Sequence, residues 1–322
     1  MKASVIIPAY NAQKTIGMCL DALMKQTYTD YEVIVIDDGS SDNTASIVNA
    51  YPVRYVRQEN SGPACARNRG VSLSSGEVIL FTDSDCIPSQ NWISEMVSVF
   101  EADPEVVAIK GVYKTNQSQL IARFAQAEFE ERYDICQKSK TISMVDTYSA
   151  AYKKDIFTTA GGFDESFPTA NNEDTELSYK MSSKGYKMVF NPKVVVYHLG
   201  HPSSVWDYMR KKFWRGYWRM VVYKRFPAKM IKDAYTPQTL KIQILLLFMI
   251  LIAVVGQLVV PSMLYLTGII GVAFFLTTIP FMLKTIKRDL LIGVVSPLYL
   301  VLRALAIGGG VFYYFVKKKL ND

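Results

Sequence analysis

The stretch VIVIDDGSSDNTASIVNA, residues 33–50, contains the two patterns that decide the fold. Four consecutive β-branched residues predict a buried strand, and the polar turn after them leads into a helix expected over Asn43–Ala50. The same alternation continues on both sides, with strands expected at Ala3–Ala9, Glu32–Asp37, Val53–Arg57 and Glu77–Thr82 and helices at Ala12–Lys25 and Ala64–Leu73. Further elements are expected at Thr115–Lys140 (helix), Glu173–Lys184 (helix) and Val194–Tyr197 (strand). This alternation predicts an α/β domain with a mostly parallel sheet flanked by helices.

The composition excludes two classes of protein. Of the 322 residues, 50% are hydrophobic and 20% are charged, which is not the composition of a disordered chain. The apolar residues gather after Ile242, which excludes an ordinary soluble enzyme. The four cysteines form no C-x-x-C pair, so we expect neither a zinc site nor a disulfide framework. The chain opens on a strand pattern rather than a signal peptide, and we expect the first domain in a reducing cytoplasm.

Three apolar segments follow Lys241. Ile242–Val260 and Ser262–Leu283 carry no charge, and each approaches the ~20 residues that cross a bilayer as a helix. We therefore expect them to form a membrane-spanning hairpin. Leu290–Val316 is longer, but it contains Arg303, a proline and three consecutive glycines. The sequence leaves two alternatives for this last segment: a third span, or a helix that lies partly in the interface.

A basic and aromatic segment precedes the apolar ones. Residues 203–241 contain ten Lys and Arg against two Asp, while the whole chain carries a net charge of +7. Such a stripe alone would fit nucleic acid, but the interleaved tryptophans and tyrosines, next to apolar runs, favour a helix at the membrane interface. The positive-inside rule places this segment and the N-terminal domain on the cytoplasmic side. If residues 290–316 cross the bilayer, Lys317–Lys319 conflicts with that orientation, because these lysines would lie outside.

The chain thus divides into an α/β domain over residues 1–202, an interface segment over 203–241 and a membrane region over 242–322. In the first part, polar residues follow the strands, and ligands of open α/β sheets bind at the carboxyl ends of strands. Asp83-Ser84-Asp85 is such a pair of carboxylates, placed directly after an apolar strand. Paired oxygens suit Mg²⁺ or Mn²⁺, and the cation would neutralise a departing diphosphate. Alone, the motif is weak, because most carboxylates with this spacing are solvated loop residues.

Several motifs in a fixed order make the pattern more specific. In chain order they are SVIIPAYNA at 4–12, VIVIDDGSSDNT at 33–44, GPACARNRG at 62–70, the Asp83–Asp85 pair, GGFDE at 161–165 and NED at 172–174. Together they resemble the inverting family 2 glycosyltransferases with a GT-A fold. The resemblance covers about residues 3–200 and is far more specific for the family than for the substrate. More distantly, the chain is similar to cellulose synthase and to enzymes like dolichol-phosphate mannose synthase.

The resemblance implies roles for residues on the donor side. The nucleotide base and ribose would lie against Pro8, Ala9 and Tyr10. Asp38, with Asp37 beside it, would accept a hydrogen bond from the base. The remaining donor contacts would come from Ala64, Arg67, Asp83 and Ser84.

The resemblance also implies a metal site and a general base. Asp85, with Asp83, would bind Mn²⁺ or Mg²⁺, and His198 would be a third ligand. Asp174 of the Glu173-Asp174 pair would take the proton from an acceptor hydroxyl, and a single displacement through an oxocarbenium-like transition state would invert the anomer. Without the other motifs, Asp174 would instead be interpreted as an acid at a helix N-terminus, and His198 as a structural histidine.

The interface segment holds one further candidate. Lys212-Phe213-Trp214-Arg215 lies where membrane-bound relatives such as cellulose synthase carry Gln-x-x-Arg-Trp, with Lys in place of Gln and Gly216 in place of the last Trp. Arg215 would either clamp the diphosphate or contact a lipid headgroup. The altered motif argues against polymer binding.

We therefore expect a membrane-anchored inverting hexosyltransferase with no nucleic-acid partner. Its donor would be a nucleotide-diphosphate sugar, GDP-mannose first and a UDP-sugar second, and its acceptor a hydroxyl of a lipid-linked saccharide or glycolipid. A polyprenyl-phosphate sugar synthase is an alternative, although an ionised phosphate acceptor needs no base such as Asp174. A processive polysaccharide synthase and an inactive nucleotide-sugar-binding subunit of a membrane complex are further alternatives. The small number of spans argues against the former and the intact acids against the latter.

Overall fold

The computed structural model describes residues 1–167, 169, 171–231 and 235–321. Contacts divide the chain into two compact units. Unit 1 consists of Met1–Gln117 and Tyr133–His201, and unit 2 of Ser118–Arg132 and Pro202–Asp322. The long helix α5 (Leu120–Gln137) therefore begins in unit 2 and ends in unit 1.

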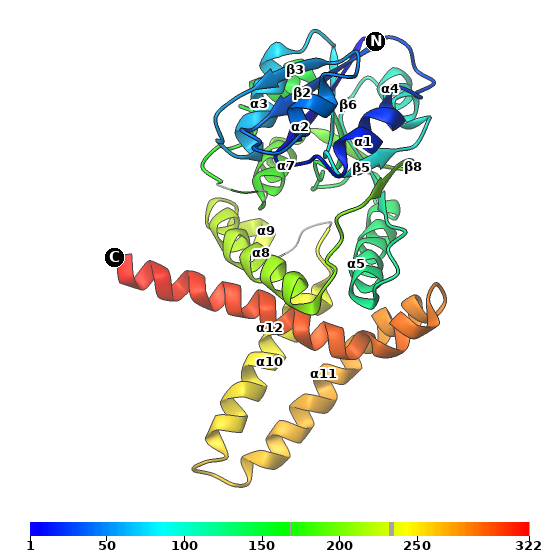
Figure 1. Ribbon diagram of the computed structural model, residues 1–322. Coiled ribbons are helices and arrows are strands. Elements are labelled where there is room, and N and C mark those ends of the chain that lie inside the picture. Colours follow the sequence, from blue (N-terminus) through cyan, green and yellow to red (C-terminus); the bar gives the residue numbers. More distant parts are fainter. Residues whose placement is uncertain (168, 170, 232–234, 322) are drawn as a thin grey trace. The chain divides into compact units, whose positions relative to one another are not determined.

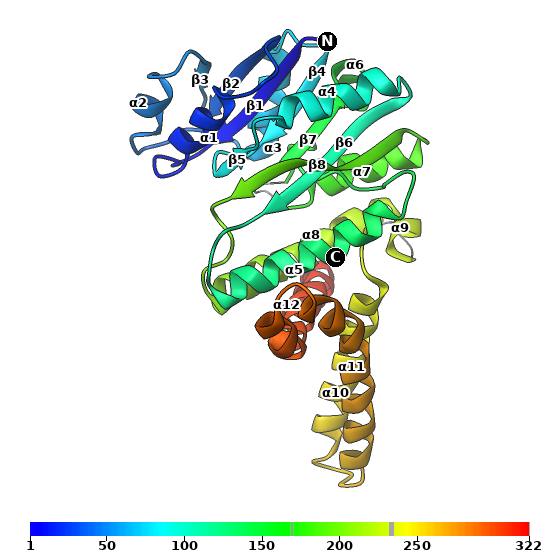
Figure 2. The ribbon, with the colours of Figure 1, turned by 90° about the vertical axis from the view of Figure 1, so that its right-hand side faces the viewer.

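Unit 1 (Figure 1) is built on one mixed sheet, whose strands are labelled in Figure 2 and follow the order β3-β2-β1-β4-β7-β6-β8-β5. The parallel half contains β1 (Ala3–Ala9), β2 (Tyr31–Asp37), β3 (Arg54–Arg57) and β4 (Val78–Thr82). The other half contains β5 (Cys86–Pro88), β6 (Val106–Lys114), β7 (Ser149–Lys153) and β8 (Lys187–His198). In it β7 runs antiparallel to both β4 and β6, while β6 and β8 are parallel. The expected α/β class is confirmed.

Helices connect and flank these strands. They are α1 (Ile16–Leu23), α2 (Thr44–Val48), α3 (Pro63–Leu73), α4 (Trp92–Ala102), α6 (Lys154–Thr159) and α7 (Glu173–Ser183). The prediction of a helix from Ala12 was wrong at its start, because Thr15 N–H closes a turn on the Ala12 carbonyl before α1 begins. The strand expected at Val194–Tyr197 is the last part of the longer β8.

Unit 2 is helical. Its helices after α5 are α8 (Val205–Arg225), α9 (Pro227–Ile231), α10 (Gln238–Gly256), α11 (Met263–Ile286) and α12 (Leu290–Asn321). Helices α10 and α11 form the expected hairpin, which Figure 2 shows edge-on. Within the described residues, three helices are long and apolar enough to cross a membrane, over Gln238–Gly256, Met263–Ile286 and Leu290–Leu320. A small core of α5, α8, α11 and α12 side chains, including Phe124, Tyr208 and Phe281, holds the unit together.

Candidate active site

The carboxyl ends of three parallel strands bring the first candidate residues to one edge of the sheet. Strand β1 pairs in parallel with both β2 and β4, so the segments that follow Ala9, Asp37 and Thr82 leave the sheet at the same edge. Tyr10 follows β1 with 55% of its surface exposed, and Ala9 before it is buried. An exposed aromatic ring at this edge is free to stack on a planar ligand.

Asp37 and Asp38 at the end of β2 organise the loops around them. Asp37 accepts hydrogen bonds from the Ser40 N–H at 2.8 Å and the Tyr55 hydroxyl at 2.6 Å. Both acids are buried. Asp38 accepts from three donors, which are the Gln58 amide at 2.7 Å and the N–H groups of Ser61 and Gly62, both at 2.9 Å. A carboxylate offers about four acceptor positions, and donors from the described residues take three of those on Asp38.

Arg67 is the central cation of unit 1. It lies on α3, next to the buried Ala64 face of that helix, and is 2% exposed. One guanidinium nitrogen, Nη2, lies 2.8 Å from Asp83 Oδ1, and the other, Nη1, lies 2.9 Å from Glu173 Oε1. Burial alone would lower the pKa of Arg67, but Asp83 and Glu173 raise it. A permanently charged guanidinium therefore joins the loop after β4 to the start of α7.

Glu173 and Asp174 open α7 in different environments. Asn172, with φ at +72°, turns the chain into the helix. Glu173 is buried, and burial together with the neighbouring Asp174 raises its pKa to about 7 against the opposing effect of Arg67. Asp174 is half-buried, and its Oδ1 accepts from the Thr175 N–H at 2.6 Å. Among the described residues its hydrogen bonds all fall on Oδ1, so Oδ2 is available as a proton acceptor.

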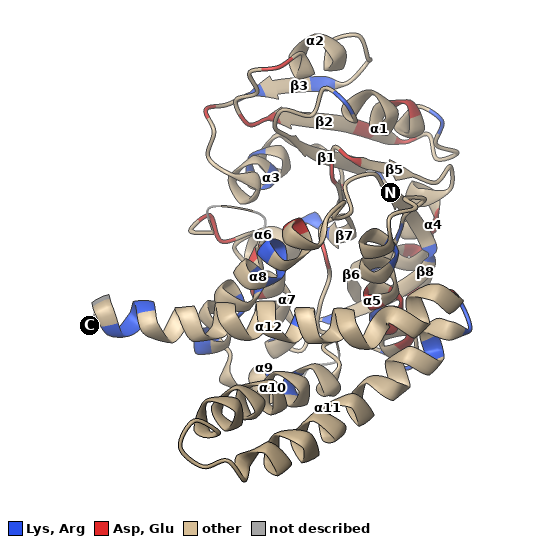
Figure 3. Ribbon diagram, turned by 60° about the horizontal axis from the view of Figure 1, so that its bottom comes forward, with Lys and Arg blue, Asp and Glu red and all other residues tan. Residues whose placement is uncertain are grey.

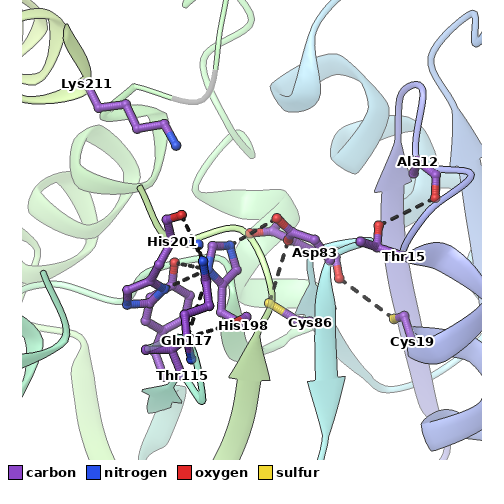
Figure 4. Close-up of polar contacts among 12 residues, drawn as sticks. Ala12, Thr15, Cys19, Asp83, Cys86, Thr115, Gln117, His198, His201 and Lys211 are labelled. Atoms are coloured by element: carbon purple, nitrogen blue, oxygen red, sulfur yellow. Dashed lines mark hydrogen bonds and ion pairs between the residues drawn. The ribbon is translucent and has the colours of Figure 1, made fainter. Parts of the chain in front are cut away.

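Asp85, Cys86 and His198 form a group that could hold a metal ion, with ligand atoms within 4.8 Å of one another. Figure 4 labels Cys86 and His198 of this group. The antiparallel pairing of β5 with β8 places Cys86 opposite His198 and so brings the acid to the imidazole. His198 Nε2 lies 3.0 Å from Asp85 Oδ2. Burial, with Asp83 and Asp85 nearby, raises the pKa of the Cys86 thiol well above its usual range, so without a bound metal the thiol is protonated. The carboxylate and the imidazole are a donor set that fits Mn²⁺ better than Mg²⁺.

A buried aromatic and imidazole cluster lies behind His198. The Tyr113 hydroxyl is 2.7 Å from His198 Nδ1, and His201 Nδ1 is 2.9 Å from the same atom. The Tyr113 ring packs on both imidazoles, with centroids 4.4 and 4.7 Å away. Because Nδ1 is occupied by these neighbours, the Nε2 atom of His198 is the one directed at Asp85. Gly200 completes the site, since a Cβ there would collide with Asp85 Oδ2.

The structure therefore gathers most of the candidate residues in unit 1, with one change in their grouping. Asp83 is paired with Arg67, and the position next to Asp85 and His198 is taken by Cys86. Pro8 and Ser84 are half-buried beside this edge of the sheet. Sequence reasoning missed three residues of this site, because none of them belongs to a recognised motif: Tyr113, Cys86 and Gly200. A signal did exist for His201, since the sequence contains two histidines and it is the second. Arg215 lies half-buried on α8 of unit 2, and its role toward a diphosphate stays a prediction.

Residues 4–160 match the family model described as Glycosyl transferase family 2. The chain carries a family 2 glycosyltransferase domain. It is 29% identical over 221 residues to glycosyltransferase AglE of Haloferax volcanii, a match that covers 65% of this chain and 70% of that protein. It is 26% identical over 265 residues to poly-β-1,6-N-acetyl-D-glucosamine synthase of Staphylococcus aureus, covering 76% of this chain and 63% of that protein. A match to glycosyltransferase GlyG of Streptococcus pneumoniae, 40% identical over 122 residues, covers 36% of this chain and 40% of GlyG.

Among solved structures, the chain is similar to the mannosyltransferase PcManGT from Pyrobaculum calidifontis in complex with GDP-Man and Mn²⁺. The TM-score is 0.64 at 21% identity, and the match covers 98% of this chain and 88% of that one. This likeness confirms the expected GT-A fold. The family 2 domain and the relatives named as glycosyltransferases establish that the protein is a glycosyltransferase, and inversion is typical of family 2.

Proposed function

We propose that this glycosyltransferase is anchored in a membrane and transfers a sugar from a nucleotide-diphosphate donor to a hydroxyl of a lipid-linked saccharide or glycolipid. The observation that carries the proposal is the acid cluster around Arg67. There Asp83 and Glu173 share one buried guanidinium, while Asp85 and Asp174 remain half-exposed. The candidate membrane spans of unit 2 are the reason for proposing an acceptor in the lipid phase.

Each residue of the cluster has a distinct part in the reaction. Mn²⁺ or Mg²⁺ held by Asp85 and His198 would neutralise charge that develops on the leaving diphosphate. Asp174 Oδ2 takes the proton of the acceptor hydroxyl, while the Thr175 N–H holds Oδ1 and fixes the orientation of the carboxylate. Arg67 keeps Asp83 in place on the donor side and ties it to α7, which carries the base.

We propose GDP-mannose as the donor, with a UDP-sugar as the alternative, and Mn²⁺ as the cation. The complex of PcManGT with GDP-Man and Mn²⁺ supports both choices, as does the imidazole in the donor set. The excess of basic residues on α8 supports a catalytic domain on the cytoplasmic side of the membrane. On that side it would meet nucleotide sugars.

The test of donor and metal is nucleotide release in detergent from a panel of GDP- and UDP-sugars, with Mn²⁺ or Mg²⁺ and with a lipid extract as the acceptor source. We expect GDP release with Mn²⁺, and none from the Asp85→Ala variant. Release that is equal in the wild type and the variant, or that is indifferent to metal, would contradict the metal site.

The test of the base is Asp174→Asn, compared with Asp155→Asn. Both acids are the second residue of a helix, α7 and α6 respectively, so each substitution removes an acid from the first turn of a helix. Loss of a general base costs roughly 10²–10⁴-fold in rate, so we expect that loss only for Asp174→Asn, with nucleotide affinity retained. Full transfer by Asp174→Asn would favour the alternative of an already ionised polyprenyl-phosphate acceptor.

A further inference from the structure

Helix α12 contains an 18-residue stretch apolar enough for the helix to count as a third span. We propose that it instead lies in the plane of the membrane interface alongside α8, with the lipid surface as its partner. Of the three candidate helices, α10 and α11 then cross the bilayer, and the C-terminal lysines stay on the side of α8. The reasons come from the packing of unit 2 alone.

The first reason is that α12 packs closely against α8, and the two helices cross in Figure 1. A Cβ on Gly216 of α8 would collide with the Ile307 carbonyl of α12, and one on Gly310 of α12 would collide with the Phe213 carbonyl of α8. The two backbones therefore touch at two successive places, each made possible by a glycine. The contact continues to the C-terminal end of α12, where the Lys317 ammonium lies 5.5 Å from the centre of the Tyr217 ring.

The second reason is that α8 cannot enter the hydrocarbon. It carries seven Lys and Arg against one Asp. Each Lys or Arg at the centre of a membrane helix costs roughly 2.5–3.5 kcal/mol on insertion scales, so seven would be prohibitive. Aromatic side chains between the bases suit the headgroup region instead. Because the backbones of α8 and α12 touch at Gly216 and Gly310, this part of α12 lies at the same depth as α8.

The third reason is the direction of α12 relative to the α10–α11 hairpin. In both views α12 runs at a large angle to the α10–α11 hairpin (Figures 1 and 2). The hairpin is tan in Figure 3 except near the ends that join it to the rest of unit 2, where Lys241 and Lys284 lie. A hairpin with this distribution of charge crosses the bilayer along its length, so a helix at a large angle to it lies in the membrane plane.

The two faces of α12 differ as an interfacial helix requires. The buried face has Ile292, Ser296, Leu300 and Arg303 at helical spacing. Arg303, near the middle of the helix, donates to Gln243 at 2.8 Å and to Glu128 of α5 at 3.4 Å. The opposite face is an exposed apolar stripe whose large side chains include Leu291, Val294, Leu298, Phe312 and Phe315. The exposed apolar face suits contact with lipid, while the packed face, which carries Arg303, contacts the rest of unit 2.

This placement removes the conflict in the charge distribution. As a third span, α12 would carry Lys317–Lys319 across the bilayer, away from the bases of α8. As an interfacial helix it keeps both groups of bases on one side, in agreement with the positive-inside rule.

Sidedness tests the proposal directly. Single cysteines are placed at Lys319, at the exposed Lys211 of α8, and at Val259 in the tip of the hairpin, which is 84% exposed. The half-exposed Cys65 is changed to serine, and the other three native cysteines are buried. Intact spheroplasts and inverted vesicles are treated with a membrane-impermeant maleimide. We expect Lys319→Cys to react in the same preparation as Lys211→Cys, and Val259→Cys in the other one. Reaction of Lys319→Cys together with Val259→Cys would overturn the proposal.

Immersion depth gives a second, independent measurement. Leu291, Leu298 and Leu305 recur every seventh residue and so lie on one face of α12. A nitroxide is attached to a cysteine at each position in turn, and its depth is measured from collisions with oxygen and with a polar nickel reagent in liposomes. An interfacial helix gives three similar depths, whereas in a crossing helix the label moves about 10 Å along the helix axis, toward the bilayer centre, at each step. A steady increase from Leu291 to Leu305 would contradict the proposal.

Discussion

The two units bury charge in opposite ways. In unit 1 one cation, Arg67, is shared by two acids, Asp83 and Glu173. In unit 2 one acid, Glu128, is shared by two cations: it lies 2.8 Å from Lys212 and 3.4 Å from Arg303. Both central groups are almost fully buried, and each joins segments that are far apart in the sequence.

The clusters differ in how far they open to solvent. The Asp83 and Asp85 side chains keep 31% and 34% of their surface, so the negative excess of unit 1 can meet a cation and a ligand. In unit 2 the side chains of Glu128, Lys212 and Arg303 all keep 8% or less. A closed cluster of this kind holds helices together, whereas the open one is suited to chemistry.

The pKa values in unit 2 follow from this imbalance. Burial would raise the pKa of Glu128, but Lys212, Arg303 and Arg132 together lower it to about 2. Burial lowers the pKa of Lys212 to about 7, because Glu128 is its one close anion while Arg132 and Arg215 repel it. The two shifts are unequal because, among the described residues, three cations act on the acid and one anion on the lysine. The Lys212–Glu128 ion pair depends on Glu128, which stays ionised because its pKa is lowered.

The largest expected effect comes from breaking the closed cluster. Lys212→Met leaves Glu128 buried with less compensation, and removal of one member of a buried ion pair costs about 3–5 kcal/mol. We expect the low end of that range, because Arg303 remains beside Glu128. The measurement is unfolding of the full chain in detergent.

Lys211→Met is the matched control on the same helix. Lys211 pairs with Asp207 at 3.1 Å, but its side chain is 51% exposed, and such surface pairs contribute about 0–1 kcal/mol. Equal losses of stability in the two variants would mean that the unit 2 cluster is not the stabilising element inferred here.

The open cluster should respond in activity more than in stability. Arg67→Lys keeps the charge but removes the planar fork, so the ammonium can satisfy Asp83 or Glu173 but not both. A lost charge-assisted hydrogen bond of about 2 kcal/mol corresponds to roughly a 30-fold fall in kcat/KM. Arg69→Lys, on the exposed side of the same helix, should stay close to the wild type in the same assay. A loss shared by both variants would place the effect in α3 as a whole.

The comparison also shows which features could be predicted from the sequence. Strands β1, β2 and β4 are buried almost throughout, so their continuous apolar runs were recognisable. β7 was missed because Ser149-Ala150-Ala151 has little strand propensity, and its conformation is imposed by pairing with β4 and β6. Hydropathy also could not fix the direction of α12, since that depends on glycine contacts with α8.

The same division holds in the site. Asp83, Asp85 and Asp174 follow recognisable local patterns, and the first two leave the sheet directly after a strand. The contacts of Arg67 with the acids could not be predicted. Arg67 and Glu173, for example, are 106 residues apart and meet only through the tertiary fold. Tyr113 and Gly200 reach the metal group through the pairing of β6 with β8 and the turn after β8, and neither has a local signature.

The last expected effect concerns the pH dependence of the open cluster. Burial and Asp174 raise the pKa of Glu173 from its ordinary 4.5 to about 7, so between these values the folded state binds more protons at this site than the unfolded state does. The contribution of Glu173 to stability is therefore complete below pH 4.5 and is lost as the pH rises toward 7. Glu173→Gln removes this dependence, so the stability of the wild type relative to the variant should fall across that window. The slope of this stability difference against pH should correspond to less than one proton, that is, to less than about 1.4 kcal/mol per pH unit.

The free energy of unfolding, measured from pH 4.5 to 7, checks this prediction. The control is Glu59→Gln at an exposed position, and its stability should change with pH in parallel with that of the wild type. If the stability of the wild type relative to Glu173→Gln instead increases as the pH rises, the prediction is wrong. The attraction of Arg67 then outweighs the desolvation of the acid, and the two clusters stabilise their central ions in the same way.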